Sequence, residues 1–199
     1  DLNDLLEQVW PMATQQAVPT ESVSLNNALG RVLAQDVFSS LNVPQHDNSG
    51  MDGYAVCCTD IQPSRRFQVS QRVPAGASPQ PLQPGTVARI FTGAPIPPGA
   101  DSVVMQEDVV VNDDGSVTFS VLPKSGQWIR RAGEDIASGQ VVLSQGTRLD
   151  AIHVGLLASI GVPTVSVNRR LKVGVMVTGS ELQSPGQALQ PGQIYNSNE

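Results

Sequence analysis

Residues 44–56 of the chain, PQHDNSGMDGYAV, bring two carboxylates into a short polar segment rich in turn-forming residues. Asn, Asp, Ser and Gly favour turns because the short side chains bond nearby backbone and glycine accepts a positive φ. Asp52 stands just before the apolar residues 54–56, so we expect its carboxylate at a loop–strand junction, where scaffolds often hold reactive groups. A solvated turn with a capping aspartate accounts for the same residues. Without further information, that second interpretation is the favoured one.

Thr92 follows an expected strand over residues 86–91 and stands in the run Thr-Gly-Ala-Pro. A hydroxyl and nearby backbone N–H groups at a strand end can contact an anion. A tight turn, supported by Pro95, explains the run equally simply. Both interpretations can hold together.

Arg130 and Arg131 are followed closely by Glu134 and Asp135. Guanidinium groups bind phosphate or carboxylate with two parallel hydrogen bonds. The same four residues could instead form a surface ion-pair cluster, which usually adds little stability. The two arginines are equally consistent with a structural role at a domain junction.

The last candidate is the loop 178–182, TGSEL, which follows the β-branched run 171–177. That run is typical of a buried strand in a parallel α/β sheet. Ligands of such sheets lie beyond the carboxyl ends of the strands, which is where Ser180 and Glu181 would stand.

Residues 48–56, NSGMDGYAV, closely resemble the NSAMDGYAV signature of the molybdopterin molybdotransferases, a family that comprises the bacterial MoeA proteins and the E domain of gephyrin. The resemblance runs from about residue 25 to the end of the chain. Further matches follow in the family's order: TGAP at 92–95, VVMQE at 103–107, RRAGED at 130–135, residues 156–161 and TGSEL at 178–182.

The resemblance implies a reaction, the insertion of molybdate into adenylylated molybdopterin with release of AMP, and it implies dependence on Mg²⁺. It gives Asp52, Asp135 and Glu181 the role of holding Mg²⁺ or its waters, and Thr92 that of positioning substrate beside these three catalytic acids. The further residues that would bind substrate with Thr92 are Arg130, Arg131 and Ser180. Two acids of the family pattern are absent, because Ser180 replaces the usual Asp and 195–198 read YNSN rather than YDTN. The metal geometry is therefore open.

The net charge of −6 and the pI near 4.8 argue against a nucleic-acid surface, which needs clustered Lys and Arg. An anionic substrate then requires local arginines or a divalent cation to offset repulsion. No apolar run approaches the roughly 20 residues that cross a bilayer, and the first residues lack the pattern of a signal peptide. Cys57 and Cys58, as adjacent reduced thiols, fit a cytoplasmic protein.

The expected fold is mainly β with a few helices. Residues 1–10 have helical apolar spacing and Pro11 would end that helix, while Ser24 would cap a short helix ending before Gly30. A third helix would begin after Asp150, end at Gly161 and bury one apolar face. The residues of that face are Ile152, Leu156, Leu157 and Ile160.

Short strands separated by Pro- and Gly-rich turns predict a compact β domain, a barrel or sandwich. The expected strands include 67–69, 86–91, 102–106, 117–121 and 141–143, with a hairpin turn at Asp113-Asp114-Gly115. We expect a discontinuous helix-containing domain, 1–43 with 136–168, interrupted by the β domain 44–135. Residues 169–199 would then begin an α/β molybdopterin-binding domain, so the chain looks truncated.

The family resemblance also implies a homodimer, whose active cleft lies between the β domain of one subunit and the molybdopterin-binding domain of its partner. On that basis we expect the chain alone to be inactive. The resemblance further suggests other molybdenum cofactor biosynthesis proteins as partners. A non-catalytic dimerisation or scaffold module, of the gephyrin kind, is the alternative function, and a pterin-phosphate hydrolase is a third one with no feature of its own.

Overall fold

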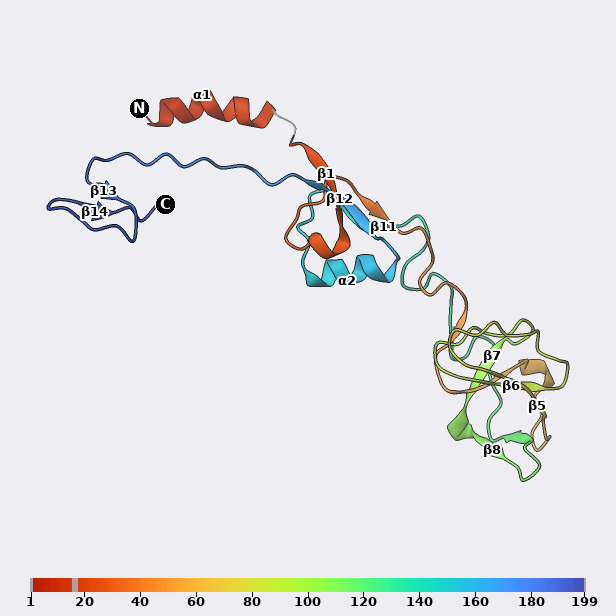
Figure 1. The fold of residues 1–199 in the computed structure, drawn as a ribbon. Coiled ribbons are helices and arrows are strands. Elements are labelled where there is room, and N and C mark those ends of the chain that lie inside the picture. Colours follow the sequence, from red (N-terminus) through yellow and green to blue (C-terminus); the bar gives the residue numbers. More distant parts are fainter. Residues whose placement is uncertain (1, 16–17, 199) are drawn as a thin grey trace. The chain divides into compact units, whose positions relative to one another are not determined.

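A computed structural model describes residues 2–15 and 18–198, which fall into two compact units, Asp1–Glu21 with Asn168–Glu199 and Ser22–Val167. The expected mainly β fold is confirmed, with two α-helices among the described residues (Figure 1). The helices are α1 Leu2–Gln15 and α2 Ala151–Ser159, and the single 3-10 turns are η1 Leu25–Asn27, η2 Cys58–Asp60 and η3 Gln106–Asp108. The strands are β1 Thr20–Ser24, β2 Val37–Phe38, β3 Asn48–Ser49, β4 Gly53–Val56, β5 Val69–Val73, β6 Val87–Ile90, β7 Ser102–Met105, β8 Val109–Val111, β9 Val117–Phe119, β10 Ile129–Arg130, β11 Val141–Leu143, β12 Thr164–Asn168, β13 Leu182–Gln183 and β14 Ile194–Tyr195.

The largest sheet has four strands in the order β5-β6-β4-β7. β4 pairs antiparallel with both β6 and β7, whereas β5 runs parallel to β6. Because successive side chains of a strand point to opposite faces, β4 contributes Tyr54 and Val56 to one core and Ala55 to another. All four residues of β4 are buried. The continuous apolar run after Asp52 is therefore a central strand covered on both faces.

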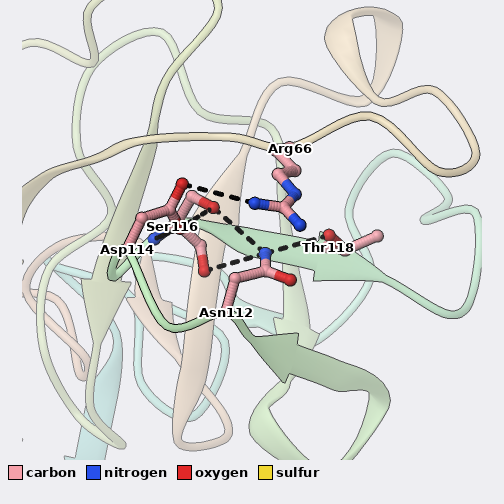
Figure 2. A network of polar contacts seen from close by, with 5 residues as sticks. All are labelled: Arg66, Asn112, Asp114, Ser116 and Thr118. Atoms are coloured by element: carbon pink, nitrogen blue, oxygen red, sulfur yellow. Dashed lines mark hydrogen bonds and ion pairs between the residues drawn. The ribbon is translucent and has the colours of Figure 1, made fainter.

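The hairpin predicted at residues 113–115 is confirmed, since β8 and β9 pair antiparallel around it. The side-chain amide of Asn112 donates to the backbone oxygen and the hydroxyl of Ser116 and to the hydroxyl of Thr118 (Figure 2). The Ser116 hydroxyl in turn donates to Asp114, which Arg66 contacts at 3.4 Å. This polar network fixes the turn, running from the fully buried Ser116 to the exposed side chains of Asp114 and Arg66.

A separate core lies around α2, where Leu157 and Ile160 pack with Leu33, Leu149 and Val167. The predicted N-cap is confirmed: the Asp150 carboxylate accepts from the backbone N–H of His153, whose ring accepts from the Asp150 N–H. The expected apolar face is wrong at one position. Ile152 is 80% exposed, because it stands one residue away from the helix face that meets the core.

Two predicted helix limits are also wrong. α1 continues past Pro11 to Gln15; Asp1, the predicted first residue of this helix, lies outside the described residues. The fixed φ of proline is compatible with a helix, but Pro11 costs α1 one backbone hydrogen bond and its ring crowds the carbonyl four residues earlier. The helix expected after Ser24 is only the 3-10 turn η1, and the Ser24 side chain makes no capping hydrogen bond. Gly30 does adopt a positive φ of 75°.

The strand predicted over residues 171–177 is not formed, and no β pairing is present there. Leu171, Val173, Val175 and Met176 are 70–88% exposed. A strand needs neighbours that satisfy its backbone and cover its side chains, and the described residues offer none here. In the same unit, β13 and β14 form a short parallel pair that the sequence did not predict.

No helix in ranges 2–15 and 18–198 is long and apolar enough to span a bilayer. The separate cores around α2 and around the four-stranded sheet are compatible with the predicted inserted β domain. The domain boundaries themselves stay a prediction.

Candidate functional site

Asp52 and Thr92 form the centre of the candidate site. The backbone N–H and the hydroxyl of Thr92 both donate to Oδ1 of Asp52, each at 2.7 Å. These two bonds, the backbone one first, lower the pKa of Asp52 below its ordinary value. Asp52 precedes β4 and Thr92 follows β6, and the antiparallel pairing of these strands brings the two residues together. The structure therefore connects two residues that the sequence predicted separately.

The loop that carries Asp52 is held on several sides. The Ser49 N–H donates to the Ala94 oxygen, and the Gly93 N–H donates back to the Ser49 oxygen. On the other side, the Gly50 N–H donates to the Trp128 oxygen, and β3 pairs with β10. Asp52 is thus presented by a loop whose backbone is bonded to both neighbouring segments.

Gly53 shows why this junction needs a glycine. A Cβ at this position would collide with the backbone oxygen of Val104 and approach the Met105 Cα to 3.1 Å. Both are backbone atoms of β7, the strand paired with β4. Close approach of the two strands beside Asp52 therefore depends on the missing side chain.

The predicted arginines are bound to acids. The Arg130 guanidinium donates to both oxygens of Asp135, at 2.6 and 2.7 Å, and also contacts Glu134. Arg131 donates to Asp47 at 2.6 Å, and hydrogen bonding from the Ala132 N–H lowers the pKa of Asp47. The pairing with Asp135 contributes most to a raised pKa of Arg130. In this arrangement both guanidinium charges are paired with acids, and the three acids outnumber the two arginines.

Glu181 and Ser180 belong to the other unit, next to β13. The Glu181 backbone oxygen accepts from the Ile194 N–H. Gly179 has a φ of 155°, and a Cβ there would lie 2.8 Å from the Glu181 carboxylate oxygens. Glu181 is therefore folded back over a turn that favours glycine.

A cavity of about 460 Å³ opens beside the Thr92 loop, a volume in the range of small-molecule sites. Its walls combine two glycines, two prolines, an alanine and three polar side chains. They are Pro44, Gln45, His46, Asn48, Gly76, Ala77, Gly93 and Pro95. The sequence did not predict this cavity, because residues 76 and 77 reach it only through the tertiary fold.

Arg89 is a second residue that sequence reasoning missed. Its guanidinium donates to the backbone oxygens of Gly53 and Ile90 and, at 2.6 Å, to the side chain of Gln106. It also lies over the Tyr54 ring, 5.2 Å from the ring centroid. An arginine inside a run of strand residues gave no signal of this role, since strand positions often carry solvated charges.

The donor set fits a magnesium ion only partly. Within the described parts of the chain, no three Asp, Glu, His or Cys side chains gather in a metal-binding group. Both oxygens of Asp135 are engaged by Arg130, whereas both hydrogen bonds to Asp52 fall on Oδ1. Mg²⁺ is commonly held by one or two carboxylates together with substrate phosphates. Oδ2 of Asp52 fits such a ligand.

Comparison with known proteins places the chain in a family. Residues 2–161 match the family model described as the MoeA N-terminal region (domain I and II). The chain belongs to this family.

Several relatives agree with this assignment. A molybdopterin molybdenumtransferase of Haemophilus influenzae is 49% identical over 98% of the chain, and one of Nostoc sp. is 43% identical over 90%. The crystal structure of a molybdopterin biosynthesis MoeA protein from Pyrococcus horikoshii matches 97% of the chain with a TM-score of 0.86 and 34% identity. The chain spans about half the length of these relatives, 47%, 42% and 51% respectively.

Proposed function

We propose that this chain supplies part of the active site of a molybdopterin molybdenumtransferase, which inserts molybdate into adenylylated molybdopterin and releases AMP. Family membership supports the reaction class. The observation that carries the proposal is the Asp52–Thr92 pair, because it presents one oriented, ionised carboxylate beside a cavity of ligand size. Asp52 stays ionised at neutral pH, as a ligand of a cation must.

Residue roles follow from the contacts. Asp52 would hold Mg²⁺ or one of its waters, and the ion would offset charge between phosphate and oxyanion. Thr92 orients the carboxylate through its two hydrogen bonds. Asp135 is paired with Arg130, and Asp47 is paired with Arg131, so these residues hold the shape of the loop. They would act on substrate only if a substrate anion replaced the carboxylate in one of these ion pairs.

Glu181 would be a further ligand of Mg²⁺, and Ser180 would contact substrate. The active enzyme would be a homodimer, and it would act in the cytoplasm. Because the chain spans about half of its relatives, we expect the chain alone to release no AMP. This expectation separates a composite site from one that is complete within residues 1–199.

The test is AMP release from adenylylated molybdopterin with molybdate and Mg²⁺. The chain is assayed alone and fused to the remaining half of the Haemophilus influenzae relative. We expect activity only in the fusion, strong loss with Asp52→Asn, and full activity with Asp113→Asn, which alters an exposed acid of the β8–β9 turn. A fusion that is active and indifferent to Asp52→Asn would refute the assignment. A folded fusion without any activity would instead favour the scaffold function.

A further inference from the structure

Arg72 and Arg89 are cross-strand neighbours in the parallel pair β5–β6, and Arg89 stands opposite Tyr54 in the next pair. Residues directly opposite each other lie on the same face of a sheet. Both guanidinium groups also lie over the ring of Phe91, each with its Cζ 4.5 Å from the ring centroid. Two positive charges therefore converge on one aromatic side chain.

This convergence is unfavourable by itself, since like charges directly opposite in a sheet destabilise it. Among the residues that the structure describes, neither arginine makes an ion pair with a carboxylate. Arg89 donates to neutral acceptors, and the exposed Arg72 lies over the Phe91 ring and forms no side-chain hydrogen bond within the described part of the chain. By contrast, Arg66, Arg130 and Arg131 each have an acidic partner.

The two charges stand next to the Asp52–Thr92 pair. Phe91 directly precedes Thr92, and Arg89 is bonded to the backbone of Gly53, the residue after Asp52. The positive charge of Arg89 also helps to lower the pKa of Asp52, after the two hydrogen bonds from Thr92. In a chain with a net charge of −6, two arginines that form no ion pair with the described residues place positive charge beside the candidate site.

We propose that Arg72 and Arg89 form a binding site for a tetrahedral oxyanion. The planar guanidinium of Arg72, held against Phe91 and with its N–H groups unused, offers two parallel donors to phosphate-like oxygens. Arg89, fixed by three hydrogen bonds, adds positive field rather than new donors. The inference rests on the proposed function, in which the oxyanion is either the phosphate group of the substrate or free molybdate.

The experiment is an NMR titration of the 199-residue chain, following the amide signals of Phe91, Thr92 and Gly93 at fixed ionic strength. Inorganic phosphate, molybdate and AMP are the probes. We expect Arg72→Gln to weaken binding about fivefold or more. The affinity of Arg72→Lys should lie between those of Arg72→Gln and the wild type, because lysine keeps the positive charge but lacks the two parallel N–H donors. Arg66→Gln is the matched control, with an expected change below about twofold, since Arg66 is exposed and paired with Asp114.

The probes separate the two sources of the oxyanion. Binding of all three indicates a site for free oxyanions, and binding of AMP alone indicates a phosphate ester; either result, when lost in Arg72→Gln, supports the proposal. Equal binding by Arg72→Gln and the wild type, or no binding of any probe, overturns it. These titrations need no turnover, so an active fusion enzyme whose N-terminal chain binds none of the probes would overturn the anion site and leave the proposed function standing.

Discussion

Replacing Gly53 with alanine tests whether the close approach of β4 and β7 positions the candidate site. The new methyl group would collide with the Val104 oxygen and crowd the Met105 Cα, and neither backbone atom can rotate away. Overpacking of this kind costs roughly 1–3 kcal/mol. Separation of the strands would also weaken one or two ladder hydrogen bonds at about 1 kcal/mol each. The expected destabilisation is therefore about 2–5 kcal/mol.

Urea unfolding of the 199-residue chain measures this cost. For a slope of about 2 kcal/mol per molar urea, the midpoint of Gly53→Ala should fall by roughly 1–2.5 M. Gly155→Ala is a matched control, for which we expect an increase in the free energy of unfolding instead of a decrease. Gly155 lies in α2 with no atom within 4 Å of a new Cβ, so alanine should stabilise the helix by up to about 1 kcal/mol. A Gly53→Ala midpoint equal to or above that of the wild type would refute the packing argument.

Three further substitutions test other parts of the structure. Thr92→Val removes the hydroxyl donor but keeps the backbone donor, so the pKa of Asp52 should rise while staying below its ordinary value; carboxyl NMR titration checks this, and an unchanged pKa contradicts the hydrogen bond. The depressed pKa also means that the stabilisation from ionised Asp52 is present above its unfolded-state pKa and is lost as the pH falls through the folded value. Burial, with the neighbouring Asp101, raises the pKa of Cys58 to about 11, so in Cys57→Ser the iodoacetamide rate should keep rising beyond pH 10; a plateau near pH 9 would be inconsistent with this. Leu157→Ala should cost about 2–5 kcal/mol in urea unfolding, because Leu157 is fully buried in the α2 core; a loss below about 1 kcal/mol would mean that this core is loosely packed.

Features encoded by neighbouring residues were predictable from the sequence. The β8–β9 turn and the Asp150 cap are examples, since each depends on groups within a few positions of one another. The Asp52–Thr92 contact joins residues 40 positions apart and exists only because β4 pairs with β6. Periodicity cannot supply that register. The run 171–177 shows the converse case, in which a local pattern favours a strand but the described chain provides no neighbouring strand.

The arrangement of arginines shows how an acidic chain can meet an anionic substrate. From the sequence, adjacent Arg130 and Arg131 were candidate anion ligands and equally candidates for a structural role. Their charges are paired with Asp135 and with Asp47, the latter 84 positions from Arg131. Such long-range pairing decides which positive charges remain available, and composition cannot reveal it. Arg72 and Arg89, which no motif marked, keep theirs because the register of β5 and β6 places them together with no ion-pair partner among the described residues. The ability to bind an oxyanion therefore depends on which arginines the fold leaves without an ion-pair partner rather than on the net charge.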